Sequence, residues 1–531
     1  MFSVLKISGV RLKILPEHKT GNIIRNMQGE YMTEAGNNYS EKKTQLHISV
    51  RNLVEFIFRE GDIDNRSSRA MSADAMMEGT RIHRKIQGSM GKEYQAEVPL
   101  SLVVEGDLYE LTVEGRADGI FTEDGKCFVD EIKGMYRKVE LFEKPVFVHR
   151  AQAMCYAYIF ALQNNMETIG IQMTYCNLET EQTKYFREEF SFEEIKKWFD
   201  DLMEEYGKWA TFQCEMKNQR QASIKELDFP YEYRPGQKKL VSDVYRTIMR
   251  QKLLFMQAPT GVGKTISTIF PAVKAVGEEL ADRIFYLTAK TITATVAKET
   301  FALLEKNGYR AKTIQITAKE KLCPCDEMEC NPVTCPYAKG HFDRVNDAVF
   351  DLLHRCEMIE RDDILSQADR YTVCPFELCL DTASWCDNII CDYNYVFDPN
   401  VYLKRFFQEG IKGDYIFLID EAHNMVERSR QMYSAQIYKE DFLTVKRIMK
   451  EHSHSIEKAL EKCNKILLGM KRECENYTVY DTFGNMVFSF MRLMTLLDEF
   501  LQKANEFPGK KDVMDFYFEL RNFLNIYDLV D

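Results

Sequence analysis

Residues 253–265 read LLFMQAPTGVGKT, an apolar run that ends in a glycine-rich turn. The pattern predicts a buried strand, a tight turn and then a helix through the following ISTIFPAVKAV. Gly261 and Gly263 would let backbone N–H groups face an anion, and the start of the helix would add its positive end. Such a turn is typical of a loop that cradles nucleotide phosphates, although Ala258 stands where the usual spacing has glycine.

The residues of this turn have distinct expected roles in holding a nucleotide. Lys264 is expected on the β- and γ-phosphates, and Thr265 on Mg²⁺. Because the backbone of the whole turn faces the phosphates, the sequence predicts an ATP site made of Thr260, Gly261, Val262, Gly263, Lys264 and Thr265.

A second apolar run, YIFLIDEAHN at residues 415–424, supplies the acidic partner that such a loop needs. Asp420 is expected to hold the Mg²⁺ of the nucleotide through water, and Glu421 to orient the attacking water. The two runs together predict ATP hydrolysis, with Glu421 as a catalytic residue.

The composition sets limits on the class of protein. A chain of 531 residues predicts several domains, and 45% apolar with 29% charged residues is ordinary for a globular protein. A net charge of −12 argues against a protein that coats nucleic acid, so any contact with DNA must be local. The sequence has neither an apolar run long enough for a bilayer nor a secretory signal, so we expect a cytoplasmic protein with no membrane partner.

A second candidate site lies earlier in the chain. Asp118 is expected at a strand end, and Glu131 and Lys133 lie two residues apart on the next expected strand, so both acids and the amine would share one side of a sheet. Carboxylate oxygens suit Mg²⁺ or Mn²⁺, and the lysine would steady negative charge or help to activate water. We predict Asp118 and Glu131 as metal ligands, His83 as a further ligand, and Asp118, Glu131 and Lys133 as catalytic. The alternative is a solvated turn with a surface ion pair.

The motifs GxxD, ExK and QxxxY, preceded by GxxxH, resemble the RecB-type branch of the PD-(D/E)xK nucleases, including CRISPR-associated RecB-like exonucleases. The resemblance implies metal-dependent cleavage of DNA, with Gln152 and Tyr156 supporting the DNA. Many such nucleases carry an iron–sulphur cluster on cysteines that flank the core. In this chain the cysteines of that region lack clustered spacing, and we expect them to be buried small residues.

Most of the 15 cysteines lie from Cys323 to Cys391, inside an interval between Lys264 and Asp420 that is longer than a nucleotide-binding core needs. Five of them cluster beside prolines, a pattern typical of a soft-metal or cluster site: Cys323, Cys325, Cys330, Cys335 and Cys374. Zinc would take four of these, or three with His341, whereas a [4Fe–4S] cluster would take four cysteines.

A four-cysteine insertion between the TAKT segment at residues 288–291 and DEAH resembles the XPD/DinG family of iron–sulphur superfamily-2 helicases, over about residues 229–426. The resemblance implies an ATP-dependent DNA helicase of the repair type, moving 5′ to 3′ on single-stranded or forked DNA. It also implies that Arg234 and Gln237 face the adenine. The implied [4Fe–4S] ligands are Cys323, Cys330, Cys335 and Cys374, with Cys325 as the main rival of Cys330.

The expected fold is α/β, with a PD-(D/E)xK nuclease domain followed by a P-loop RecA-like lobe that carries a cysteine-rich insertion and a helical arch. No QxxGRxxR string follows the DEAH residues, so we expect the chain to end before a second motor lobe. The alternatives are a single-strand DNA-binding module with an inactive motor, or a nuclease acting alone. The predicted parts are an extension at 1–45, the nuclease at 46–222, the lobe at 223–319 and 396–426, the insertion at 320–395 and the arch at 427–531.

Overall fold

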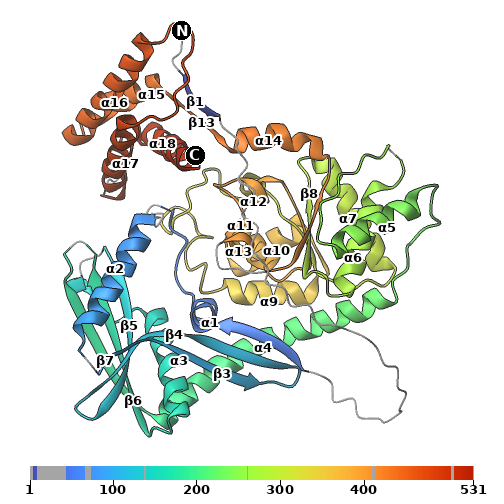
Figure 1. Ribbon diagram of the computed structural model, residues 1–531, viewed down its shortest axis with the longest axis horizontal. Helices are drawn as coiled ribbons and strands as arrows, with labels where there is room; N and C mark the ends of the chain where they lie inside the picture. The colour runs from blue at the N-terminus through green and yellow to red at the C-terminus, as the bar shows by residue number, and fades with distance from the viewer. Residues whose placement is uncertain are drawn as a thin grey trace. The chain divides into compact units, whose positions relative to one another are not determined.

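The computed structural model describes residues 4–8, 43–65, 73–91, 93–136, 139–178, 180–259, 261–408, 413–503 and 507–529 (Figure 1). These residues form two compact units. The larger unit takes its residues from Gly36–Leu280 and Glu299–Asn388, and the smaller unit from Met1–Ala35, Ala281–Lys298 and Ile389–Asp531. Most of the extension predicted at 1–45 lies outside the described residues.

The larger unit begins with a mixed sheet in the order β2-β4-β5-β6-β7, to which β3 adds on β4. The β2–β4 and β5–β6 pairs are parallel, and the β3–β4, β4–β5 and β6–β7 pairs are antiparallel. The strands are β2 (Thr44–Ser49), β3 (Gln95–Glu105), β4 (Tyr109–Glu123), β5 (Lys126–Met135), β6 (Thr168–Asn177) and β7 (Thr183–Ser191).

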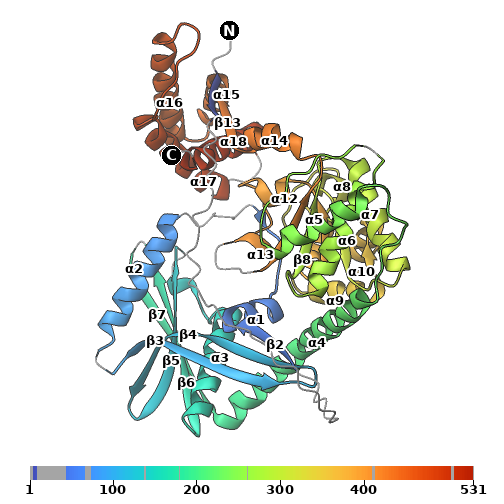
Figure 2. The same cartoon turned by 45° about the vertical axis from the view of Figure 1, so that its right-hand side comes forward.

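Helices cover both faces of this sheet (Figures 1 and 2). One apolar core joins Val113 and Ile171 to α1 (Val50–Ile57), α3 (Phe147–Gln163) and α4 (Phe192–Lys225). A separate cluster on the other face joins Ile132 and Cys176 to α2 (Ala73–Ser89). Side chains along a strand alternate between the faces, so both cores draw on the same strands. A short 3-10 helix, η2 (Val139–Leu141), lies between β5 and α3.

The alternation of apolar and polar residues predicts two strands, near 107–114 and 116–121, where the structure has the single strand β4. It runs unbroken through Gly115, and a Cβ at that position would lie 2.5 Å from the hydroxyl oxygen of Tyr156. Gly115 therefore makes room for a side chain of α3 and does not break the strand.

The rest of the larger unit is mainly helical, with a parallel pair of short strands, β9 (Thr313–Gln315) and β10 (Met358–Ile359). Helix α7 (Thr291–Lys306) crosses the boundary between the units. The other helices are α5 (Gln237–Met249), α6 (Lys264–Gly277), α8 (Lys319–Leu322), α9 (Val345–Arg355), α10 (Arg361–Tyr371) and α11 (Pro375–Ala383).

The strand predicted before the glycine-rich turn is wrong. Residues 252–259 have no regular structure, and the side chains of Leu253 and Phe255 are 89% and 88% exposed. A strand needs a neighbour that satisfies its N–H and C=O groups, and among the described residues no paired strand includes 253–257.

In the smaller unit, β8 (Arg283–Leu287) pairs in parallel with β12 (Tyr415–Ile419) and follows β11 (Asn388–Cys391) in the strand order. Parallel strand pairs therefore occur in both units, and the predicted mixed α/β class is confirmed. Short helices α12 (Asn394–Phe397), α13 (Lys404–Phe407), η3 (Ala422–Asn424) and α14 (Met425–Met432) complete this region.

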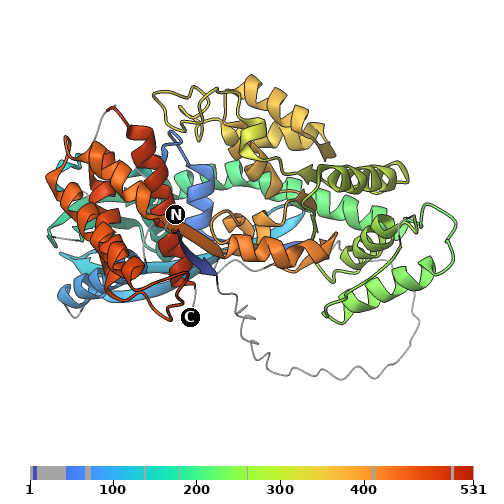
Figure 3. The same ribbon diagram turned by 90° about the horizontal axis from the view of Figure 1, so that it is seen from above.

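The smaller unit ends in four helices around an aromatic core of Phe442, Phe490, Phe516 and Phe523, seen in orange and red in Figure 3. They are α15 (Lys439–Met449), α16 (His454–Arg472), α17 (Asn485–Lys503) and α18 (Lys510–Asp528). Before them, β13 (Ser434–Tyr438) pairs antiparallel with β1 (Val4–Ser8), so part of the predicted extension is a strand. None of the described helices is long and apolar enough to cross a membrane.

Candidate functional site

Asp118 lies inside β4, and the expectation that it ends a strand is wrong. The β4–β5 register places Gly119 opposite Asp130, so Asp118 and Glu131 follow on neighbouring strands. One carboxylate oxygen of Asp118, Oδ2, accepts a 2.7 Å hydrogen bond from the N–H of Ile132. The continuing strand therefore fixes Asp118 beside Glu131 without a loop.

Glu131 is the most buried acid of this group, at 2% exposure. Its Oε1 lies 2.7 Å from Nζ of Lys133, which also donates to Oε1 of Gln152 at 3.2 Å. Its Oε2 is buried and has no hydrogen-bond partner among the described residues. Burial, reinforced by the negative charge of Asp118, raises the pKa of Glu131 to about 8. A buried carboxylate oxygen without a partner suits a cation, because an unsatisfied charge in the interior is costly.

His83 reaches the same group from α2. Its Nδ1 lies 3.6 Å from Oδ1 of Asp118, and that carboxylate raises the pKa of His83. A histidine binds metal through a neutral ring, so a cation here would have to displace the proton that Asp118 favours.

Gln152 and Tyr156 lie one turn apart on α3, and both are buried. Burial, together with the nearby Glu131, raises the pKa of the Tyr156 hydroxyl to about 12. The structure thus brings His83, Asp118, Glu131 and Lys133 together, and Gln152 joins them through its bond to Lys133. We call these five residues and Tyr156 the acid–lysine site. Among the described residues, however, no group of three or more His, Cys, Asp or Glu side chains is arranged to hold a metal ion.

The sequence analysis missed a second buried carboxylate, Asp130. It accepts hydrogen bonds from the Tyr94 hydroxyl at 3.0 Å and from the Thr174 hydroxyl at 2.6 Å, and burial raises its pKa to about 6. Two adjacent acids in an apolar strand, VDEI, were the available signal. Cys155, Cys176 and Cys214 are buried as expected, and Cys127 is partly buried.

The glycine-rich turn keeps the backbone form that its sequence predicts. Gly261 and Gly263 have φ angles of 84° and 76°, and Gly263 caps α6, whose first residues are Lys264 and Thr265. A left-handed conformation at both positions favours glycine. Val262 lies between them, and Thr260 lies outside the described residues.

Gln237 supports this turn directly. Its Nε2 donates to the carbonyl of Val262 at 3.2 Å and to the Ser267 hydroxyl at 3.1 Å, while its Oε1 accepts from the N–H of Arg234 at 3.0 Å. Arg234 also donates to the carbonyl of Gly261. Because both polar atoms of the Gln237 amide are engaged, the structure assigns it to holding the loop, in contrast to the expected contact with adenine.

Asp420 and Glu421 follow β12 in the smaller unit. The N–H of Asp420 donates to the carbonyl of Leu287 at 3.0 Å, and the fully buried Tyr393 donates through its hydroxyl to the carbonyl of Asp420. Glu421 has a φ of 51°, which turns the chain sharply after the strand. Nδ1 of His423 lies 3.5 Å from Oε2 of Glu421.

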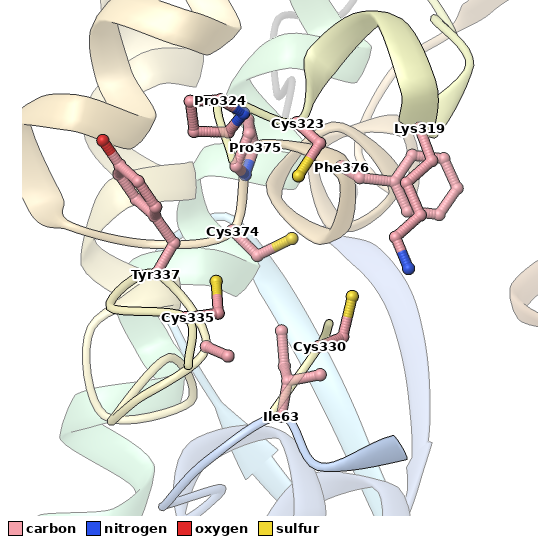
Figure 4. Close-up of a pocket in the computed structure, with 11 residues that line it drawn as sticks. Ile63, Lys319, Cys323, Pro324, Cys330, Cys335, Tyr337, Cys374, Pro375 and Phe376 are labelled. Carbon is pink, nitrogen blue, oxygen red and sulfur yellow. The ribbon is translucent and has the colours of Figure 1, made fainter. Parts of the chain in front are cut away.

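The four cysteines predicted as cluster ligands line one pocket in the larger unit (Figure 4). Their sulphur atoms point into a common space, although they come from residues 323–335 and from the residue that caps α11. The residues that line the pocket are Ile63, Lys319, Cys323, Pro324, Cys330, Cys335, Tyr337, Ala338, Cys374, Pro375 and Phe376.

Cys325 does not line this pocket, and its Sγ lies 3.9 Å from that of Cys335. His341 does not line it either: the ring is fully buried, and Nδ1 accepts a 3.1 Å hydrogen bond from the N–H of Cys374. Burial raises the pKa of the Cys374 thiol to about 11, so the thiolate needs a compensating cation. The pocket is thus lined by the four predicted cysteines and by neither Cys325 nor His341, and the choice of ligands stays a prediction.

Solved structures with partial similarity to this chain include the following three. A structure titled "Truncated XPD" is 15% identical with a TM-score of 0.35, covering 55% of this chain and 82% of that one. "XPD_Helicase" is 16% identical with a TM-score of 0.34, covering 56% and 51%. "Crystal structure of SSO0001" is 20% identical with a TM-score of 0.21, covering 31% and 78%.

Sequence comparison is more informative. Residues 303–442 match the DEAD_2 family model. The chain is 20% identical over 248 residues to Regulator of telomere elongation helicase 1 of Rattus norvegicus, covering 38% of this chain and 19% of that protein. It is 24% identical over 232 residues to General transcription and DNA repair factor IIH helicase subunit XPD/RAD3 of Saccharomyces cerevisiae, covering 37% and 29%. The chain thus spans less than a third of the curated relatives it matches, and it is similar over that part to proteins named as helicases.

Proposed function

We propose that this chain is part of an ATP-driven DNA helicase of the XPD type, fused to a metal-dependent DNA nuclease. The observation that carries the helicase proposal is the DEAD_2 match, because residues 303–442 contain both the cysteine pocket and Asp420-Glu421. The similarity to two named helicases supports it further. The domain boundaries, the 5′ to 3′ direction, the preference for single-stranded or forked DNA, the role in repair and the cytoplasmic location stay predictions from the sequence.

In this proposal the glycine-rich turn holds the triphosphate of ATP. The N–H groups around Gly261 and Gly263 and the start of α6 face the phosphates, and Lys264 neutralises their charge. Thr265 keeps its expected role as a ligand of Mg²⁺ at this turn. In the smaller unit, Asp420 and Glu421 keep their expected roles toward Mg²⁺ and the attacking water. Gln237 and Arg234 keep the turn in the phosphate-binding form through their bonds to Val262 and Gly261.

The test of the motor is DNA-stimulated ATP hydrolysis by a full-length version of the protein. Lys264→Ala removes the charge on the phosphates and is expected to abolish turnover, while Lys252→Ala, just before the turn, is expected to leave it unchanged. Undiminished turnover in the Lys264 variant would end the helicase proposal. ATP-independent binding of single strands with no turnover in the unaltered protein would instead favour a DNA-binding module with an inactive motor.

A nuclease function is favoured by the unpartnered Oε2 of Glu131 in the acid–lysine site. By chemical type, the carboxylates of Asp118 and Glu131 suit Mg²⁺ or Mn²⁺, with His83 as a further ligand, and a bound ion would polarise a phosphodiester and lower the pKa of a bound water. Lys133, whose Nζ lies 2.7 Å from Oε1 of Glu131, would stabilise the charge that develops on the phosphate. Gln152 holds Lys133 in place.

The nuclease proposal is tested by cleavage of DNA with Mn²⁺. Glu131→Gln keeps the shape of the side chain but removes its charge, so we expect cleavage to be lost while ATP hydrolysis persists. Glu97→Gln, on the exposed part of β3, serves as the matched control. Normal cleavage by the Glu131 variant would exclude this site as the nuclease centre.

We also propose that the cysteine pocket holds a [4Fe–4S] cluster on Cys323, Cys330, Cys335 and Cys374. The support is that these four thiols line one space and point into it. The iron and sulphide content of anaerobically purified protein distinguishes a [4Fe–4S] cluster from a zinc ion. Zinc without iron would overturn the proposal of a cluster.

A further inference from the structure

Residues 59–65, which follow α1, bond to residues 323–343, the segment that carries Cys323, Cys330 and Cys335 and that we call the cysteine segment. They leave the end of α1 and pass over the cysteine pocket, where Ile63 lines the same space as Cys330 and Cys335 (Figure 4). We call residues 59–65 the strap. The strap is therefore a wall of a pocket whose other walls come from residues far away in the sequence.

Main-chain hydrogen bonds hold the strap to the cysteine segment. The N–H of Ile63 donates to the carbonyl of Ala338 at 2.9 Å, and the N–H of Asn65 donates to the carbonyl of Cys330 at 2.9 Å. A third bond runs the other way, from the N–H of Phe342 to the carbonyl of Gly61 at 3.0 Å. One acceptor is thus the backbone of a pocket cysteine itself.

Two carboxylates also bond the strap and the cysteine segment to each other. Asp62 accepts from the N–H of Gly340 at 2.6 Å, and Asp343 accepts from the N–H of Gly61 at 2.7 Å. Hydrogen bonds from an N–H to an ionised carboxylate are stronger than those between neutral groups. The strap and the cysteine segment therefore bind each other through reciprocal side-chain contacts as well.

Arg59 anchors the start of the strap to the helix that presents the fourth cysteine. Its guanidinium lies 2.8 Å from Oδ2 of Asp381 and donates to Oδ1 of Asn346 at 2.8 Å. The Arg59 and Asp381 side chains are only 20% and 8% exposed. Asp381 lies on α11, whose first residue follows the capping Cys374.

We propose that the strap is a latch through which an occupied cysteine pocket holds the predicted nuclease domain against the cysteine segment. The proposal rests on the proposed function, because it needs a metal cluster or ion bound by the four cysteines. Bound thiolates fix the backbone at Cys330 and Cys335, and thereby the carbonyls that accept from the strap. When the occupant leaves, these loops lose their fixed geometry and the strap loses its acceptors. The same chain continues from the strap to α2, which carries His83 of the acid–lysine site.

Hydrogen exchange of the strap amides tests the latch directly. The measurement compares protein as purified with protein stripped by an iron chelator and with Cys330→Ser. We expect exchange at Gly61, Ile63 and Asn65 to be at least about 10-fold faster in the stripped and substituted proteins. The amides of β6, inside the sheet, should be unchanged and serve as the internal control.

The reverse experiment follows release of the occupant. Ile63→Ala opens one wall of the pocket and is expected to speed the transfer of iron to the chelator several-fold. Val333→Ala is the matched control, since Val333 lies in the cysteine segment, is 78% exposed and does not line the pocket.

The outcomes distinguish a failure of the latch proposal from a failure of the proposed metal binding on which it rests. Bound metal with unchanged strap exchange and equal release rates in Ile63→Ala and Val333→Ala overturns the latch alone. Protein that binds neither iron nor zinc overturns the cluster and the latch together. ATP hydrolysis measured on the same sample judges the motor independently of both.

Discussion

Gly115→Ala tests whether the acid–lysine site depends on the close contact between β4 and α3. A Cβ at position 115 would lie 2.5 Å from the Tyr156 hydroxyl oxygen, 2.9 Å from its Cε1 and 3.1 Å from its Cζ. The backbone of Gly115 does not have a positive φ, so alanine brings no conformational strain. The whole effect of the substitution therefore comes from the displacement of Tyr156.

The size of the effect follows from this geometry. Ordinary contacts begin near 3.4 Å, so the Tyr156 ring must move by about 1 Å within a core where it is only 3% exposed. Overpacking of this kind costs about 1–3 kcal/mol of stability. A shift of about 1 Å beside reacting groups lowers a rate by on the order of 100-fold.

Two measurements follow the change separately. All three tryptophans, Trp198, Trp209 and Trp385, lie in the larger unit, so a urea titration followed by tryptophan fluorescence reports the stability of that unit. Mn²⁺-dependent DNA cleavage reports the acid–lysine site, and ATP hydrolysis of the same sample is the internal control. Gly88→Ala is the matched variant, because a Cβ there meets nothing within 4 Å.

The expected result is lower stability and weaker cleavage in Gly115→Ala, with neither change in Gly88→Ala. Tyr156→Phe removes the oxygen of the shortest contact, so Gly115→Ala should cost less stability in that background. If Gly115→Ala left both stability and cleavage within error of the unaltered protein, the contact would not position this site.

Four further predictions test other parts of the account. In metal-free protein the pKa of Glu131 is raised from 4.5 to about 8, so the folded protein keeps a proton that the unfolded chain releases. The contribution of this group to stability is therefore full below about pH 4.5 and is lost as the pH rises through 8. Glu131→Gln should remove this loss of stability in urea titrations across that pH range. Arg59→Ala leaves Asp381 buried without its cation and should cost roughly 3–5 kcal/mol, less if Asp381→Ala accompanies it. Gln237→Ala should raise the KM for ATP by about 10-fold, since lost hydrogen bonds of about 1 kcal/mol each loosen the turn; an unchanged KM would contradict its role. Cys330→Ser should lower the iron content of purified protein and Cys325→Ser should not, and the opposite pattern would reverse their assignment.

Much of the larger unit could be predicted from periodicity, because each of its helices and strands carries its own pattern. Helical spacing predicts helices near 74–89 and 149–163, which form as α2 and α3, and alternation predicts strands near 94–104 and 126–132, which form as β3 and β5. The division of β4 was wrong because a glycine that admits a neighbouring ring looks, in sequence, like a glycine that breaks a strand.

The apolar run at 253–257 shows the limit of the same reasoning. Its composition predicts a strand, yet a strand depends on a partner that local sequence does not reveal. The side chains of the acid–lysine site came together because strand alternation fixed their sides. The partners of Gln237 could not be foreseen, since an amide beside a phosphate loop can contact either the base or the loop.

The cysteine residues illustrate a third case. Their clustering beside prolines indicated a metal site, and the family resemblance selected four of them, which line one pocket. The strap over that pocket had no signal in the sequence, because its bonds join segments that lie far apart in the chain, three of them between main-chain groups.

Strand separation of a forked duplex tests the central claim most directly. With ATP and Mg²⁺, a full-length version of the protein is expected to release the labelled strand from a fork that has a 5′ single-stranded tail, and its Lys264→Ala variant is expected to release none. Equal release by the Lys264 variant, or release without ATP, would contradict a helicase powered at the glycine-rich turn.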